Sequence, residues 1–218
     1  MNLVNQSDVI VAVQAGDLEK LRGMLQDDHC LASARDSSGV SAVMHALYRR
    51  RPDIAELLIS ANPDLDIFEA TALGNAAKVS EILKRDPDAG KVWSGDGFTA
   101  LHFAAFFGRP EIAKDLIRNG ADVAAVAKNP MKVTPLHSAA AAHSGEIVLL
   151  LVENGAPANA RQEGGWTALH EAAQIGDQEM VKTLLKYGAD PHARNNEGKT
   201  PVQMAQAKGH DHIVKLLS

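Results

Sequence analysis

Histidine has the clearest chemical potential in this chain, which contains 218 residues and nine histidines. An imidazole nitrogen can bind a metal ion or exchange a proton near neutral pH. His102, His137 and His170 follow one another at nearly equal intervals. A metal site or a catalytic base needs side chains that meet at one point, whereas a regular interval predicts one histidine in each unit of a repeat. We therefore expect these three histidines to be structural.

The other reactive side chains form no known catalytic pattern. "GHDH" places His210 and His212 beside a carboxylate, but this close spacing is a weak indication of a metal site. Cys30 is the single cysteine, so no internal disulfide or thiolate cluster can form. The chain contains no G-x-S-x-G, Walker or H-E-x-x-H motif. The sequence thus predicts a protein with no catalytic residues, no metal and no cofactor.

Charge and hydropathy exclude further classes of function. The formal net charge is −5, and the one basic run, "RRR" at 49–51, is too short for a nucleic-acid footprint. No apolar run approaches the length of a membrane span, and the start "MNLVNQSDVI" lacks the basic segment of a secretory signal. We expect a cytoplasmic monomer that binds neither nucleic acid nor membranes.

The elements that carry the histidines recur along the chain. "TALHFAAFFG", "TPLHSAAAAH", "TALHEAAQIG" and "TPVQMAQAKG" begin at Thr99, Thr134, Thr167 and Thr200, again at nearly equal intervals. A threonine before an apolar-periodic run can cap a helix. Each phrase is followed by a second helical one, such as "EIAKDLIRNGAD", and Gly120, Gly155 and Gly188 stand where helix C-caps are expected. Weaker copies begin at Ser7, Ser41 and Leu65. The pattern predicts stacked helix pairs with one continuous core.

These phrases resemble the ankyrin repeat, whose signature is T-P-L-H-x-A in a period of about 33 residues. The whole pattern is also similar to small stand-alone ankyrin proteins of bacteria. The resemblance implies an all-α solenoid of seven helix-pair repeats, with short β-turn fingers and with each motif histidine bonded near a turn. The expected repeats are 5–36, 37–64, 65–93, 94–128, 129–161, 162–194 and 195–218, which form a single domain over 1–218.

Two irregularities interrupt the repeat. The interval from Ser41 to Leu65 is much shorter than the others, which predicts that one finger is missing between the second and third repeats. Such a deletion is either harmless or leaves a notch that admits a partner. Conversely, "AVAKNPMKVT" carries two extra residues and predicts a longer finger with Asn129 and Pro130 at its tip.

The resemblance implies a non-enzymatic protein–protein interaction module, whose partner protein or peptide binds a concave groove formed by the first helices and the fingers. Three of the five phenylalanines lie in "FAAFFG" at 103–108. We interpret Phe103 as filler between repeats, and we expect Phe106 and Phe107 to form an apolar pocket beside Ala141 and Ala142. The candidate partner-binding residues are Tyr48, Trp93, Phe98, Phe106, Phe107, Met131, Val133, Trp166 and Ile175.

Three alternatives stay open at this stage. The aromatic rings can instead fill space between repeats, because burial of a phenylalanine side chain is favourable by about 1.5–3 kcal/mol. The same pocket, or the histidines, could serve a small-molecule or metal-linked role. The patch could also mediate self-association, because exposed contiguous apolar surfaces mark interaction sites.

Overall fold

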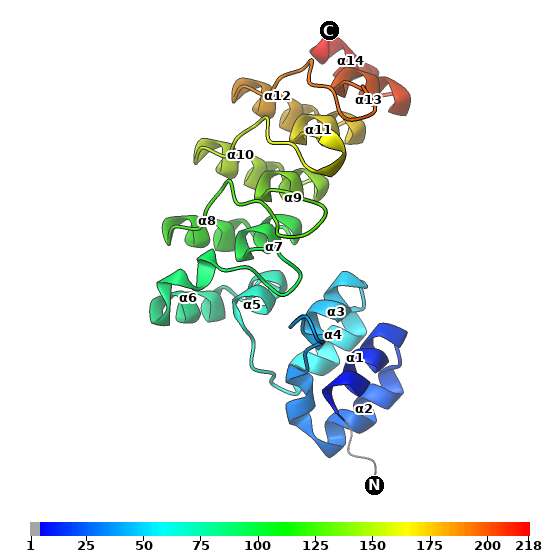
Figure 1. Ribbon diagram of the computed structural model, residues 1–218, viewed down its shortest axis with the longest axis vertical. Helices are drawn as coiled ribbons and strands as arrows, with labels where there is room; N and C mark the ends of the chain where they lie inside the picture. The colour runs from blue at the N-terminus through cyan, green and yellow to red at the C-terminus, as the bar shows by residue number, and fades with distance from the viewer. Residues whose placement is uncertain (1–4) are drawn as a thin grey trace.

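The computed structural model describes residues 5–218. They form a column of helix pairs, with α1 at one end and α14 at the other (Figure 1). Within those residues there are fourteen α-helices and no β-strand longer than an isolated bridge. The pairs are α1 (Gln6–Ala15) and α2 (Leu18–Asp27), α3 (Ala42–Tyr48) and α4 (Pro52–Ser60), α5 (Ile67–Leu73) and α6 (Ala76–Arg85), α7 (Ala100–Phe106) and α8 (Pro110–Arg118), α9 (Pro135–Ala141) and α10 (Gly145–Glu153), α11 (Ala168–Ile175) and α12 (Gln178–Lys186), and α13 (Pro201–Lys208) and α14 (Asp211–Leu217). Each pair lies inside one of the predicted repeat ranges.

The predicted helix caps are confirmed. Thr99, Thr134, Thr167 and Thr200 each precede the first helix of their pair and share a reciprocal capping box with the third helical residue. Such a box satisfies two backbone N–H groups that a helix start otherwise leaves free. Gly120, Gly155 and Gly188 follow second helices with φ between 83° and 87°, a left-handed conformation that glycine adopts without strain.

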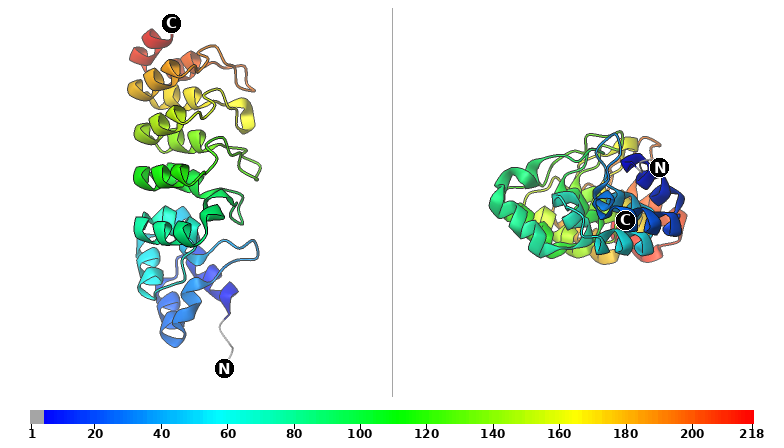
Figure 2. Two further views of the ribbon diagram at one scale, coloured as in Figure 1. Left: turned by 90° about the vertical axis from the view of Figure 1, so that its left-hand side faces the viewer. Right: turned by 90° about the horizontal axis from the view of Figure 1, so that it is seen from below.

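The fingers are short hairpins that project from one side of the column (Figure 2). The fingers at 36–40, 94–98, 162–166 and 195–199 are each closed by a backbone hydrogen bond between their first and last residues. The finger at 127–133 is closed by a bond of 2.8 Å from the Ala127 N–H to the Val133 carbonyl, which encloses a longer turn. The prediction of two extra residues in this finger is therefore confirmed.

The missing finger is also confirmed. Only residues 61–66 connect α4 to α5, and Asn62 turns the chain there with a φ of 54°. The two fingers on either side meet where the missing one would stand: a Cβ atom on Gly95 would clash with the Ser38 carbonyl oxygen. The notch that the missing finger could have left is therefore only a cavity of about 100 Å³ between these two fingers.

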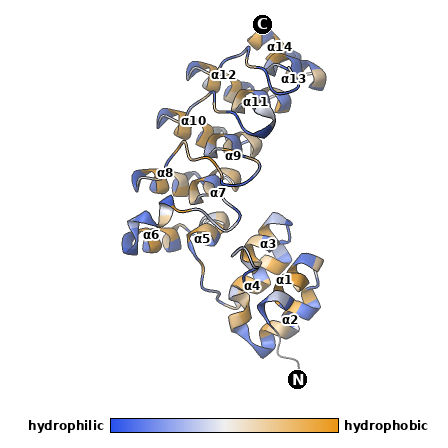
Figure 3. Ribbon diagram, in the orientation of Figure 1, coloured by the Kyte–Doolittle hydropathy of each residue, from blue (hydrophilic) through white to orange (hydrophobic). Residues whose placement is uncertain are grey.

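The core is divided where the finger is missing, contrary to the expectation of one continuous core. One cluster of buried side chains extends from Val9 to Leu58 and another from Ile67 to Leu217. We call α1–α4 the N-terminal block and α5–α14 the C-terminal block. A small cluster of Val40, Met44, Ala72 and Phe103 joins them. Along both blocks, apolar residues face neighbouring helices (Figure 3). The division coincides with the shortened connection at 61–66.

Candidate functional site: an apolar pocket on the finger side

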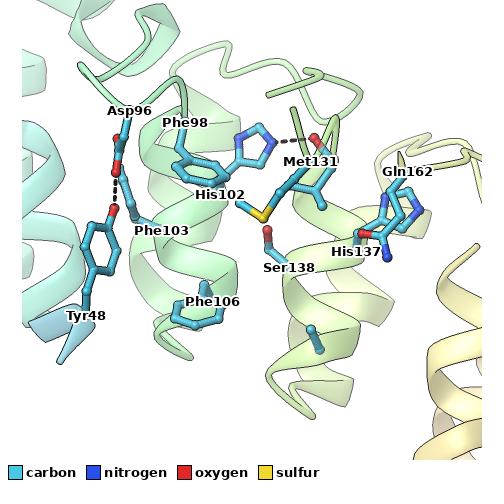
Figure 4. Close-up of a pocket in the computed structure, with 12 residues that line it drawn as sticks. Tyr48, Asp96, Phe98, His102, Phe103, Phe106, Met131, His137, Ser138 and Gln162 are labelled. Carbon is cyan, nitrogen blue, oxygen red and sulfur yellow. Dashed lines mark hydrogen bonds between the residues drawn. The ribbon is translucent and has the colours of Figure 1, made fainter. Parts of the chain in front are cut away.

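A cavity of about 500 Å³ opens between α7 and α9 on the side from which the fingers project (Figure 4). First helices and fingers both contribute to it. The residues that line it are Tyr48, Asp96, Phe98, His102, Phe103, Phe106, Met131, Val133, His137, Ser138, Ala141 and Gln162. Its volume is in the range of sites that bind small ligands or anchor side chains.

Aromatic rings form the wall on the α7 side. Phe103 is 3% exposed, and its ring centre lies 5.7 Å from that of Phe98 and 6.4 Å from that of Tyr48. The interpretation of Phe103 as filler is confirmed, because its ring packs in the cluster that joins the two blocks. Phe106, one turn further along α7, is 49% exposed and forms the open edge of the pocket.

The opposite wall depends on the long finger and on small residues of α9. Met131 lies in that finger, is 51% exposed, and extends over the pocket (Figure 4). Val133 of the same finger also lines the pocket. Ser138 and Ala141 occupy the α9 positions that correspond to Phe103 and Phe106 in α7. Because the two side chains of α9 are small where those of α7 are large, the helices pack closely and still leave a cavity.

The histidines of the pocket are structural, as predicted. The Nδ1 atom of His102 accepts a bond of 3.2 Å from the Thr99 N–H and lies 2.8 Å from the threonine hydroxyl. Its Nε2 atom lies 3.1 Å from the Val133 carbonyl oxygen, so this nitrogen must carry the hydrogen and donate it. His137 and His170 repeat the arrangement with Trp166 and Lys199.

These bonds leave the histidines little capacity for chemistry. Burial lowers the pKa of His102 to about 4, against the opposing effect of its bond to the Val133 carbonyl. Burial also lowers the pKa values of His137 and His170. Each ring is thus neutral at pH 7 with both nitrogens engaged, which leaves no free lone pair for a metal or a substrate proton. In His210 and His212, one ring nitrogen, Nε2, bonds to the carbonyl of Gln174 and of Gly176, respectively.

The structure brings five of the nine candidate residues together: Tyr48, Phe98, Phe106, Met131 and Val133 line the pocket. Phe107 does not, and neither does Ala142, although both were expected beside it. Phe107 packs against the cluster that joins the two blocks, with its ring centre 5.2 Å from that of Phe106. Phe107 and Ala142 occupy equivalent positions after the threonine cap of their repeats.

The remaining candidates, Trp93, Trp166 and Ile175, are dispersed. Trp93 lies beneath the Lys128 ammonium, 3.6 Å from the ring centre, and lines the small cavity between the fingers. Trp166 is partly buried against His170, at 5.9 Å between ring centres. Ile175 packs on the core of the C-terminal block. These three side chains therefore lie outside the pocket.

The sequence interpretation did not include Asp96, Ser138 and Gln162 as pocket residues. Asp96 accepts hydrogen bonds from the Tyr48 hydroxyl and from the Ser94 hydroxyl. The signal that could have identified Ser138 is its alignment with Phe103 in the neighbouring repeat. Asp96 and Gln162 belong to separate fingers, and the packing of the fingers brings them to the pocket.

One group of potentially reactive side chains lies outside the pocket. Asp28, His29 and Cys30 are consecutive exposed residues whose ligand atoms lie within 4.8 Å of one another. An Asp28 carboxylate oxygen already accepts the Cys30 N–H at 2.9 Å and so caps the short helix that follows.

Within residues 5–218, no helix combines the length and hydropathy needed to cross a membrane.

Comparison with known proteins agrees with the geometry. The family described as "Ankyrin repeats (3 copies)" matches residues 67–162, 101–195 and 136–218. Together these segments cover more than half of the chain, which therefore belongs to the ankyrin repeat family. Ankyrin repeats generally mediate protein–protein interaction, and their stacked units form extended concave binding surfaces.

Similar proteins contain this kind of segment within much longer chains. The chain is 36% identical over 94 residues to the probable E3 ubiquitin-protein ligase XBOS31 of Oryza sativa subsp. japonica, covering 43% of this chain and 21% of that protein. It is 34% identical over 133 residues to the ankyrin repeat and SAM domain-containing protein 6 of Rattus norvegicus, covering 56% and 15%. It is 29% identical over 161 residues to the ankyrin repeat domain-containing protein SAT10 of Stachybotrys chartarum, covering 72% and 8%. The aligned segments thus represent about a fifth or less of these relatives.

Proposed function

We propose that this chain is a non-enzymatic recognition module that binds a partner protein or peptide on its finger side, with the apolar pocket as the anchor point. The observation that carries the proposal is the pocket itself, in which Phe106 and Met131 are about half exposed around a cavity of about 500 Å³. Anchoring side chains in desolvated pockets contribute much of the binding energy of protein interfaces.

The packing of the pocket wall supports this function. Phe98 and Phe103 are held by one another and by the cluster between the blocks, so the wall is formed before a partner arrives. A preorganised wall lowers the entropy cost of binding. The expected monomeric state and cytoplasmic location complete the proposal, and light scattering across protein concentrations tests the former.

The test uses the whole chain as bait in affinity purification from its source organism, followed by binding measurements with the purified interactor. Ala141 is exposed on α9, and Ala141→Phe places a large side chain there that fills the pocket. The repeat accepts a phenylalanine at this position, because the corresponding residue of α7 is Phe106. Leu149→Ala is the matched control, because Leu149 is 37% exposed on α10, a second helix.

We expect the wild type and Leu149→Ala to retain the same interactor, and Ala141→Phe to bind it at least about tenfold more weakly, equivalent to about 1.4 kcal/mol. Phe106→Ala should act in the same direction with an unchanged thermal midpoint. An interactor held equally by Ala141→Phe and the wild type would contradict the pocket as the anchor.

A further inference from the structure

Asp96 is the one carboxylate among the residues that line the pocket, and its role differs from that of the aspartate in the finger at 36–40. In the finger at 36–40, Asp36 accepts the N–H groups of Ser38 and Val40. In the finger at 94–98, the Ser94 hydroxyl accepts the Phe98 N–H, at 3.1 Å. The Asp96 carboxylate stands outside this pattern, because within residues 5–218 it accepts hydrogen bonds from the hydroxyl groups of Tyr48 and Ser94 and from no backbone N–H.

No cation among residues 5–218 forms an ion pair with Asp96. Within residues 5–218, no ion pair includes its carboxylate, and the two lysines of the neighbouring finger are engaged elsewhere. Lys128 covers the ring of Trp93, and Lys132 lies 3.8 Å from Glu163. Burial and the Asp96 carboxylate raise the pKa of Tyr48, so the phenol stays protonated and donates to Asp96. The edge of the pocket therefore carries one unpaired, partly buried negative charge.

An unpaired carboxylate at the edge of an apolar site selects among partners. A basic group placed beside it gains a charge-assisted hydrogen bond, while an acidic group is repelled. The aliphatic stems of lysine and arginine can also lie along apolar walls and keep the charged end at the rim. Asp96 lies beside Phe98 and Phe103 in the wall of the pocket (Figure 4). When a large side chain of a partner fills the pocket, the residues next to it in the partner's sequence therefore lie close to this charge.

We propose that the partner segment bound here combines a large apolar side chain, which fills the pocket, with an adjacent lysine or arginine that pairs with Asp96. This inference rests on the proposed function, because it specifies the partner chemistry of the same pocket. The charge complementarity at Asp96 carries it, independently of the shape of the cavity.

The test is selection of short random-sequence peptides displayed on phage, with the whole chain as the immobilised target. Three targets are compared in parallel: the wild type, Asp96→Asn and Asp190→Asn. Asp190→Asn is the matched control, because it removes the same charge away from the pocket and an asparagine oxygen can still accept the His192 N–H. Thermal unfolding of each variant verifies that it is folded.

We expect the wild type and Asp190→Asn to enrich peptides in which a large apolar residue stands next to lysine or arginine. Asp96→Asn should still enrich the apolar residue but lose the basic one, and it should bind the selected wild-type peptide about tenfold more weakly at low salt. This loss should shrink as the ionic strength rises.

The outcomes separate the two proposals. Enriched peptides without a basic residue, or a basic preference that persists in Asp96→Asn, would overturn the inference while the pocket remains a binding site. Peptides that bind Ala141→Phe as tightly as the wild type would overturn the proposed function itself, because filling the pocket would then have no consequence.

Discussion

The N-terminal and C-terminal blocks are built from the same kind of helix pair but are held together by different side chains. In the C-terminal block, the third residue of α7, α9 and α11 is a histidine that links its own helix cap to the next finger. In the N-terminal block, the corresponding residue of α3 is Met44, and only the Ser41 hydroxyl caps the helix. At the junction the position is taken by Glu69, which pairs with Arg35 at 2.9 Å. The side chain at this one position of the repeat therefore differs between the two blocks and at their junction.

This difference, together with the divided core, suggests that the blocks unfold as separate units. In a repeat protein, stability is approximately a sum of unit and interface terms, so a weak interface separates cooperative units. The pocket lies between α7 and α9 in the C-terminal block, and among its lining residues Tyr48 alone comes from the N-terminal block.

The largest effect is expected from cavities placed in either core. Leu58→Ala and Leu136→Ala truncate side chains that are 0% and 1% exposed, and each should lower the stability of its block by about 2–5 kcal/mol. Hydrogen exchange measured by mass spectrometry should show lost protection over 9–58 for Leu58→Ala, with residues 100–184 protected as in the wild type. Equal loss along the whole chain in both variants would show a single cooperative unit.

Acidification should destabilise the C-terminal block first. His102 has a pKa of about 4 in the folded chain and about 6.5 when unfolded. Between these values only the unfolded state takes up the proton, so the free energy of unfolding falls as the pH falls, by about 3 kcal/mol in full. The measurement is urea unfolding followed block by block between pH 7 and pH 4.

The N-terminal block should lose stability at a lower pH than the C-terminal block. Although partial burial opposes it, hydrogen bonds from Ser38, His45 and backbone N–H groups lower the pKa of Asp36 to about 2, so the contribution of Asp36 to stability is lost only at more acidic pH.

The seventh repeat provides the control variant for His102. His102→Gln copies Gln203, whose side chain accepts the Thr200 N–H at 2.9 Å. This variant should be less stable at pH 7 and should lose less stability between pH 6.5 and pH 4. An unchanged pH profile would exclude His102 as the cause.

Removal of the ion pairs at the junction should have a smaller effect on stability. It should also make the two blocks unfold more independently of each other. Arg35 lies 3.1 Å from Asp66 and 2.9 Å from Glu69, which is 2% exposed. Burial and the Asp66 carboxylate raise the pKa of Glu69, and Arg35 acts in the opposite direction. Arg35→Ala leaves a buried carboxylate without its cation and should cost about 1–3 kcal/mol.

The readout for Arg35→Ala is the interval between the unfolding midpoints of the two blocks, which should widen. Lys78→Ala is the matched control, because its exposed pair with Glu81 should contribute less than about 1 kcal/mol. A uniform downward shift of both midpoints would show that Arg35 stabilises the whole chain rather than the junction.

The smallest effect is expected from Tyr48→Phe, which removes the hydroxyl that bonds to Asp96 across the missing finger. The loss should be about 0.5–1.5 kcal/mol, the usual net contribution of one hydrogen bond. Tyr187→Phe provides the comparison, because that hydroxyl makes only an exposed contact of 3.4 Å with Glu153. Thermal unfolding of both variants measures the difference, and equal midpoints would show that the Tyr48–Asp96 bond does not hold the blocks together.

Particular residues show how far the candidate site could be predicted from the sequence. Phe106 and Met131 were identified because the repeat does not prescribe large apolar side chains at their positions. Phe107 was misplaced, because the sequence spacing shows that two residues share a broad helix face but not which neighbouring helix each one meets. Asp96 was not recognised, because a lone carboxylate in a turn is ordinary until the fold places Tyr48 beside it.

The amino-acid sequence alone determined the repeat, its caps, its structural histidines and both irregular connections. These depend on hydrogen bonds and helix periodicity among residues that are close in the chain, so they can be read from spacing. Only the tertiary structure decided that the core divides at the missing finger, that the neighbouring fingers meet there, and that an unpaired carboxylate stands at the rim of an apolar pocket. Those features depend on packing between residues from different repeats, which the period of the sequence does not specify.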